Sequence, residues 1–152
     1  MSATDRIEKF IDLAAPLSRV WRALTDHEEF GTWFRLKLDG PFVVGQEATG
    51  YVTYPGYRHL RFLAFVKAIE PERYFAYTWT PYPADTTRDY SKETPTLVEF
   101  MLEATPQGSR LRVRESGFDK LPADRRAEAF RMNTNGWGVQ MENIRNHVEA
   151  AS

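Results

Sequence analysis

The sequence predicts an α+β fold, in which a curved antiparallel sheet of about six to seven strands wraps around one long C-terminal helix. Strand-like alternation of apolar and polar residues fills much of residues 46–115, which suits antiparallel strands with one buried face. Two short helical patterns follow the first strand. The last helix needs a broad concave surface, because one of its faces is lined with mostly large apolar side chains. This stripe consists of Phe130, Thr134, Trp137, Met141, Ile144 and Val148.

The first strand is expected at residues 6–13, and two short helices are expected directly after it. Pro16 suits the first residue of a helix, where a missing N–H group does no harm. Thr25 then fits the cap of the second helix, with Glu28 three residues later completing a capping box. The apolar positions of the two helices are Leu17, Val20, Trp21 and Leu24, and then Phe30, Trp33 and Phe34.

Five further strands are expected between turn signals that contain proline or glycine. They span residues 46–54, 60–69, 73–80, 96–104 and 109–115. The polar segment 81–94 contains two prolines, and we expect it to be a long mobile loop. The sequence leaves open whether this loop acts as a lid.

Successive side chains of a strand point to opposite faces of the sheet, which divides the last hairpin into two sets. The charged set is expected to form a solvated face, where opposite charges on neighbouring strands attract each other. It contains Glu99, Glu103, Arg110, Arg112 and Arg114. The apolar set, expected to face inward, contains Val98, Phe100, Leu102, Leu111 and Val113.

The same alternation places Glu115 on the inward face, in line with Leu111 and Val113. Two interpretations of this carboxylate stay open. It lies at a cavity mouth, where it fixes or protonates a ligand, or it caps the turn at Ser116-Gly117 or pairs with an arginine.

Aromatic residues make up 14% of the chain, enough either to line an apolar pocket or to fill a core. Gly136 and Gly138 each cost a helix about 1 kcal/mol relative to alanine. They therefore predict a soft point near residues 133–138, where a neighbouring backbone, a bend or a ligand needs room. The candidate ligand-binding residues are Trp33, Tyr54, Phe62, Tyr77, Trp79, Phe100, Glu115, Phe118, Phe130, Trp137 and Met141.

Composition argues against several classes of protein. The net charge is −1, from 20 basic and 21 acidic residues, so no nucleic-acid partner is expected. The chain has no cysteine, which excludes disulfides and thiolate metal sites. No apolar run approaches the roughly 18 residues of a membrane span, and no signal peptide is apparent. We therefore expect a single cytoplasmic domain spanning residues 1–152.

No metal site and no cofactor are expected. His27, Glu28 and Glu29 are consecutive, and neighbouring residues of a helix do not converge on one ion. His147 lies where a cation suits the helix dipole. The pair Arg58-His59 either binds an anionic ligand group or forms a solvated turn.

Several short runs, spread in order along nearly the whole chain, match a known family. They are Ala15-Pro16, Val20-Trp21, Thr25-Asp26, Trp33-Phe34, Pro41-Phe42, Pro71-Glu72-Arg73, Tyr77-Thr78-Trp79, Gly108-Ser109-Arg110-Leu111, Glu115-Ser116-Gly117-Phe118 and Gly136-Trp137. The chain resembles bacterial proteins related to the activator of the Hsp90 ATPase, within the START-like, or SRPBCC, superfamily. This resemblance implies a helix-grip fold with a cavity between sheet and helix. Many such relatives carry histidine where this chain has Glu115.

The resemblance does not fix a function, because relatives include lipid carriers, cyclases and co-chaperones. The leading hypothesis is binding of a small hydrophobic or aromatic molecule (a lipid, a flavonoid or a polyketide-like compound) between sheet and C-terminal helix. One alternative is a chaperone-interacting stress protein. Another is an enzyme of the cyclase or hydratase kind that uses Glu115 as general acid or base. A monomer or weak dimer is expected.

Overall fold

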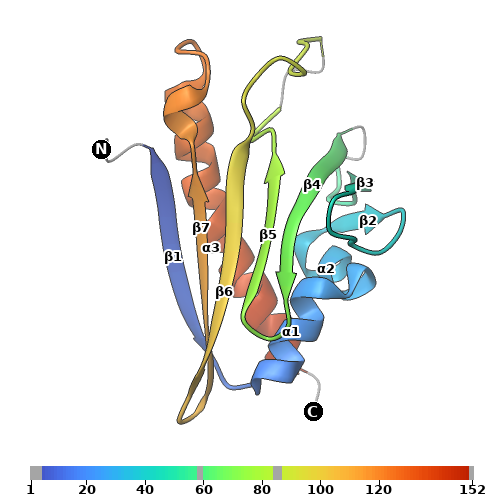
Figure 1. Cartoon of the computed structure of the whole chain (residues 1–152), viewed down its shortest axis with the longest axis vertical. Helices are drawn as coiled ribbons and strands as arrows, with labels where there is room; N and C mark the ends of the chain where they lie inside the picture. Colours follow the sequence, from blue (N-terminus) through green and yellow to red (C-terminus); the bar gives the residue numbers. More distant parts are fainter. Residues whose placement is uncertain (1–4, 58–59, 84–86, 151–152) are drawn as a thin grey trace.

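The computed structural model describes residues 5–57, 60–83 and 87–150. In this part of the chain, seven strands form one antiparallel sheet, and a long helix packs across it (Figure 1). The predicted α+β class and the helix-grip arrangement are therefore confirmed.

The sheet has the order β1-β7-β6-β5-β4-β3-β2, so that β1 and β2 form its two edges. Its strands are β1 (Arg6–Leu13), β2 (Leu36–Leu38), β3 (Glu47–Val52), β4 (Arg61–Glu70), β5 (Tyr74–Trp79), β6 (Thr96–Thr105) and β7 (Gly108–Ser116). The helices are α1 (Leu17–Thr25), α2 (His27–Phe34), the short 3-10 helix η1 (Phe118–Lys120) and α3 (Arg126–Ala150). The sequence did not predict β2, because three residues are too few to show an alternation.

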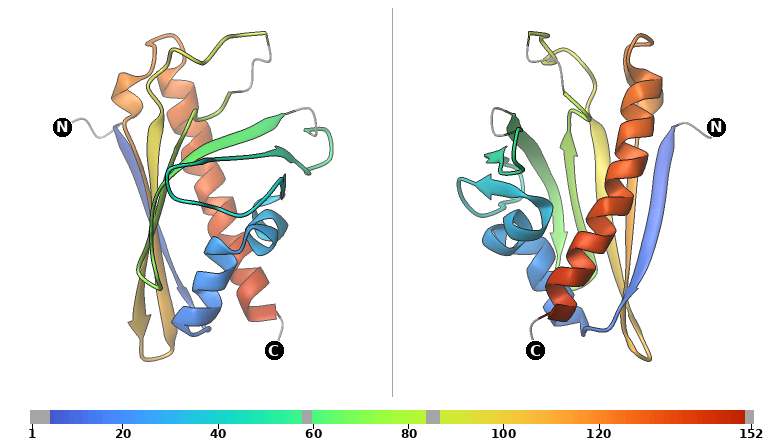
Figure 2. Two further views of the ribbon diagram at one scale, coloured as in Figure 1. Left: turned by 45° about the vertical axis from the view of Figure 1, so that its right-hand side comes forward. Right: turned by 180° about the vertical axis from the view of Figure 1, so that it is seen from behind.

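Helix α3 crosses the concave face of the sheet, and α1 and α2 lie beside its C-terminal half (Figure 2). The buried residues of α3 include Trp137, Met141, Ile144 and Val148, which belong to the predicted stripe. Phe130 and Thr134, at the N-terminal end of that stripe, are only half-buried. The predicted stripe is therefore buried more deeply from Trp137 onwards than at its N-terminal end.

The predicted capping of the first two helices is wrong in detail. Thr25 is the last residue of α1, and its hydroxyl donates to the carbonyl oxygen of Trp21 at 2.8 Å. Asp26 caps α2 instead, because its carboxylate accepts from the backbone N–H groups of Glu28 and Glu29 at 2.9 and 3.2 Å. Pro16 is the residue before α1 rather than its first residue.

The outer face of the last hairpin is less solvated than predicted. Glu99 is only 8% exposed, because neighbouring strands on both sides cover it. The hydroxyl of Tyr74 donates to Glu99 Oε2 at 2.5 Å, and Arg114 Nε donates to Oε1 at 2.9 Å. Burial acts to raise the pKa of Glu99, but the hydrogen bonds from Arg114 and Tyr74 outweigh burial and lower it.

Candidate ligand-binding site

Glu115 lies inside the fold, as the alternation along its strand predicts, and its exposure is 0%. On the sheet it is paired with Ile7 of β1 on one side and with Val98 of β6 on the other. Tyr77 of β5 follows in the same row, beyond Val98. The carboxylate is therefore set among apolar and aromatic side chains, where it depends on hydrogen bonds for its stability.

Four neutral side-chain donors surround the Glu115 carboxylate. Oε1 accepts from Trp137 Nε1 at 2.8 Å and from Asn133 Nδ2 at 2.9 Å. Oε2 accepts from Trp79 Nε1 at 2.7 Å and from Thr96 Oγ1 at 2.6 Å. Each carboxylate oxygen has two lone pairs and accepts two hydrogen bonds, so its capacity to accept is fully used. Because the donors belong to β5, β6 and α3, this one side chain joins the sheet to the C-terminal helix.

These contacts differ from the second interpretation that the sequence left open for Glu115, a cap on the turn after β7 or a pair with an arginine. The turn after β7 is held by Asp5, whose carbonyl oxygen accepts from the N–H groups of Gly117 and Phe118, both at 3.1 Å. Gly117 adopts a φ of 102°, which favours glycine. The described partners of Glu115 are neutral groups, not an arginine.

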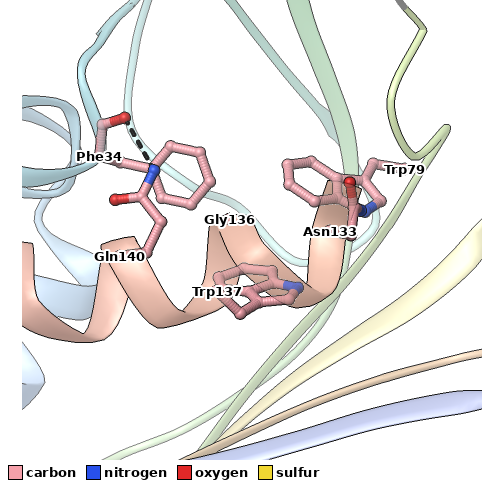
Figure 3. A pocket seen from close by; sticks show the side chains of 6 residues that line it. All are labelled: Phe34, Trp79, Asn133, Gly136, Trp137 and Gln140. Atoms are coloured by element: carbon pink, nitrogen blue, oxygen red, sulfur yellow. Dashed lines mark hydrogen bonds between the residues drawn. The ribbon is translucent and has the colours of Figure 1, made fainter. Parts of the chain in front are cut away.

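A pocket of about 170 Å³ opens beside the donors of Glu115. In Figure 3, Trp79 and Asn133 lie at one end of this pocket, Phe34 and Gln140 lie at the other, and Gly136 lies between them. Trp137 also lines it. The ring centroids of Phe34, Trp79 and Trp137 are 5.9 to 6.0 Å apart, so the three rings contact one another.

Gly136 has no side chain to fill the space beside this pocket. Apart from its chain neighbours and the backbone of α3, no atom of the described residues would lie within 4 Å of a Cβ atom built on Gly136. A Cβ atom on Gly138 would lie 4.0 Å from Lys9 Cε. Helix α3 runs through both glycines without a break. Among the described residues, no backbone of another element approaches either Cβ position, and the Cβ position of Gly136 faces open space.

A second pocket, of about 300 Å³, shares Phe34, Trp79 and Asn133 with the first. Its other walls include Val52 of β3, Phe62 of β4, and Tyr82, Pro83 and Tyr90 of the segment between β5 and β6. We call the two pockets together the aromatic groove. Their volumes, taken together, fall within the roughly 300–1,000 Å³ typical of small-molecule sites.

The predicted site residues divide into three groups. Phe62, Trp79 and Trp137 line the aromatic groove, and Glu115 lies behind it. Tyr54 is 55% exposed and packs against Tyr57, outside the groove lining. The remaining ones pack into or against the core: Trp33, Tyr77, Phe100, Phe118, Phe130 and Met141. The pair Arg58-His59 lies outside the described residues.

The predicted set of ligand-binding residues did not contain Phe34, Asn133, Gly136 and Gln140, although all four line the smaller pocket. A pattern was available for the last three. They lie three and four residues apart on α3, which puts them on one face beside the apolar stripe. Small or polar residues in that position indicate a face that is not closely packed against an apolar surface.

Residues 14–149 match the model of a protein family, which is described as Activator of Hsp90 ATPase homolog 1-like protein. The chain belongs to this family. No curated protein shows significant sequence similarity to the chain.

Solved structures resemble this member of the Activator of Hsp90 ATPase homolog 1-like family along almost its full length. Protein MLL2253 from Mesorhizobium loti has a TM-score of 0.76 at 24% identity, covering 97% of this chain and 98% of its own. The Aha1 dimer from Colwellia psychrerythraea has a TM-score of 0.70 at 17% identity, covering 95% and 96%. DynU16, from the dynemicin biosynthetic locus, has a TM-score of 0.73 at 20% identity, covering 95% of this chain and 47% of its own. At these identities the likeness shows the fold alone.

In this family member, Arg125 holds one wall of the groove in place. Its guanidinium donates to Glu93 at 2.7 to 3.1 Å and to the carbonyl oxygens of Pro81 and Tyr82 at 2.9 and 3.2 Å. It also lies 4.8 Å from the ring centre of Tyr90. The described parts of the predicted mobile loop are thus anchored beside the start of α3.

The interior near Glu115 also affects Tyr77, whose side chain is fully buried. Burial raises the pKa of Tyr77 well above its ordinary value, and the negative charge of Glu115 adds to this effect. Its hydroxyl has no hydrogen-bond partner among the described residues. Tyr77 is therefore a neutral phenol that packs as part of the core.

Among the described residues, no cluster of histidine, aspartate and glutamate side chains could hold a metal ion. None of the helices in that part of the chain combines the length and the apolar character needed to cross a membrane.

Proposed function

We propose that this family member binds a small, mainly aromatic molecule in the aromatic groove. The supporting observation is that Glu115 fixes Trp79, Trp137 and Asn133 along one wall while Gly136 leaves the adjoining space open. The lining consists mostly of rings and aliphatic side chains with few polar atoms, which is the usual composition of a small-molecule site.

The groove is organised before any ligand arrives. Both indole N–H groups are held by the buried carboxylate, so the two largest rings of the wall lose little freedom on binding. A site whose side chains are already ordered binds more tightly, because less conformational entropy is lost.

The position of Glu115 supports a structural role better than general acid or base catalysis. Each of its oxygens accepts two hydrogen bonds from the protein, and Glu115 does not line either pocket. A reacting group would have to displace one of these donors before it could exchange a proton with the carboxylate.

The proposal is tested by titrating the protein with indole, a small aromatic probe, while backbone amide shifts are followed by NMR. We expect saturable binding that becomes at least about tenfold weaker in Gly136→Leu, because the leucine side chain occupies the open space. Gly138→Leu is the matched control, since Gly138 does not line the groove, and it should bind indole like the wild type. Absence of binding, or equal losses in both variants, would contradict the proposal. Attention would then turn to the chaperone-interacting alternative, which an ATPase assay with a bacterial Hsp90 homologue would test.

A further inference from the structure

Asn133 presents a hydrogen-bond acceptor to the aromatic groove. Its Nδ2 atom donates to Glu115 Oε1 at 2.9 Å, and its side chain lines both pockets. If the amide were flipped, Asn133 Oδ1 would face Glu115 Oε1, and neither atom could donate a hydrogen bond. Glu115 therefore fixes the orientation in which Nδ2 faces the carboxylate. Because an amide is planar, the Oδ1 atom is then turned away from Glu115, on a side chain that lines the groove.

The other polar side-chain atoms of the smaller pocket already have partners. The indole N–H groups of Trp79 and Trp137 donate to Glu115. Gln140 donates through Nε2 to the carbonyl oxygen of Phe34 at 3.2 Å and accepts at Oε1 from Asn143 at 3.1 Å. Asn133 Oδ1 has no donor among the described residues and is therefore the acceptor that this wall offers to a ligand.

The charge behind the groove disfavours an anionic ligand. Glu115 is fully buried, and all four of its described donors are neutral, so nothing in its hydrogen-bonding shell cancels its negative charge. Arg61 lines the larger pocket, but its side chain is 67% exposed and lies 3.8 Å from Asp39. A ligand carboxylate near Asn133 would meet an acceptor oxygen and a buried negative charge.

We propose that the groove selects a neutral aromatic molecule that carries a hydrogen-bond donor, such as an aromatic N–H or a phenolic O–H, and that this group donates to Asn133 Oδ1. This inference rests on the proposed function and narrows its ligand class. Asn133 is the specificity-determining residue, and Glu115 is the positioning residue that fixes its amide.

Two nearly isosteric probes isolate this hydrogen bond. Indole carries a ring N–H group, and benzofuran has a ring oxygen in its place, so the two differ little in shape or apolar area. A hydrogen bond to a half-buried acceptor is expected to make indole bind about three- to tenfold more tightly than benzofuran. Benzoate, an anion with a single ring, is expected to show no saturable binding.

A pair of protein variants assigns the preference to Asn133. Asn133→Leu removes the acceptor together with one donor to Glu115. Thr96→Val also removes one donor to Glu115, but Thr96 lies outside the groove lining. The readout is the ratio of the dissociation constants of benzofuran and indole. An indirect effect of a substitution on the fold changes both affinities alike and leaves this ratio unchanged.

The experiment measures dissociation constants of indole and benzofuran for the wild type and for both variants by NMR titration. We expect the preference for indole to persist in Thr96→Val and to fall to about one in Asn133→Leu. Equal affinities for the two probes in the wild type would overturn the inference and leave the proposed function standing, whether or not Asn133→Leu folds. A preference that persists in Asn133→Leu, or benzoate binding as tightly as indole, would also overturn the inference. Failure of all three probes to bind would remove the proposed function and, with it, this inference.

Discussion

Glu115 Oε1 lies 2.8 Å from Trp137 Nε1, so a strand of the sheet and the C-terminal helix are joined by one buried hydrogen bond. The same carboxylate also holds Trp79 and Asn133, the two residues at one end of the smaller pocket. Stability of the fold and shape of the groove therefore depend on one side chain, and changes to that side chain should affect both.

Glu115→Gln is expected to lower the free energy of unfolding by about 2–4 kcal/mol. The glutamine amide accepts at one end only, so two of the four donors would face an NH₂ group and lose their partner. Urea denaturation measures the loss. Glu103→Gln makes the same chemical change on the exposed face of β6 and should stay within about 0.5 kcal/mol of the wild type. Similar losses in both variants would contradict the role assigned to the buried carboxylate.

Gly136→Ala and Gly138→Ala are both expected to stabilise α3 by about 0.5–1 kcal/mol, because alanine suits a helix interior better than glycine. Each new methyl group has room, since neither Cβ position has a neighbour closer than 4.0 Å among the described residues outside the adjoining turns of α3. Indole affinity should fall in Gly136→Ala and remain unchanged in Gly138→Ala. Thermal unfolding and NMR titration provide the two readouts. A destabilised Gly136→Ala would show that the space beside Gly136 is not open.

Arg125→Met is expected to free the segment between β5 and β6 and to lower the free energy of unfolding by about 1–3 kcal/mol. The substitution leaves Glu93, whose side chain is 7% exposed, with Arg88 as its remaining described ion-pair partner, at 3.4 Å. Hydrogen exchange should be faster at the amide of Glu93, which donates to the carbonyl oxygen of Tyr90.

The exposed pair of Arg145 and Glu142 supplies the control for this experiment. Arg145→Met should leave both stability and exchange nearly unchanged, because surface ion pairs contribute little. Unchanged exchange at Glu93 in Arg125→Met would mean that the arginine does not hold this wall of the groove.

Tyr74 should make the fold sensitive to alkaline pH. Burial raises the pKa of Tyr74 to about 12, and its hydrogen bond to Glu99 and the charge of Glu99 add to the increase. Because the folded-state pKa lies above the ordinary value of 10.0, this contribution is complete below about pH 10 and is lost as the pH rises towards about 12.

Tyr74→Phe should therefore show a smaller loss of stability across this alkaline range than the wild type. Urea midpoints measured at several pH values test the difference. Tyr54→Phe, at an exposed position, should keep the wild-type profile. If Tyr74→Phe follows the wild-type profile as well, the hydroxyl of Tyr74 does not carry the alkaline effect.

The features predicted from sequence were those set by periodicity. Alternation along β7 placed Glu115 inward, and the spacing of Trp137, Met141, Ile144 and Val148 identified the buried face of α3. These positions depend only on strand and helix geometry, so a single sequence is enough to find them.

Features set by neighbours from distant parts of the chain were not predictable in the same way. The burial of Glu99 depends on Tyr74 and Arg114, which belong to the two adjacent strands. Likewise, the donors to Glu115 come from three elements, and their convergence depends on the register of β5 and β6 and on the rotation of α3. Sequence spacing does not specify these relations.

The division between core and groove was also beyond the sequence. Phe100 and Trp137 have ring centroids 5.7 Å apart and are both buried in the core, yet of these two only Trp137 also lines the smaller pocket. An aromatic inventory cannot separate these two outcomes, because both residues have the inward position and the size that either role requires.

The central claim is tested most directly by the four tryptophan indole N–H resonances in an NMR titration with indole. Trp79 and Trp137 line the groove. The indole N–H group of Trp33 donates to the carbonyl oxygen of Ala23 in the core, and Trp21 belongs to α1, so neither lines the groove. We predict saturable shifts for the side-chain N–H groups of Trp79 and Trp137 and for the backbone amide of Gly136, with Trp21 and Trp33 unchanged. Saturable shifts confined to Trp21 or Trp33, or no saturable shift at Trp79 and Trp137, would contradict the account.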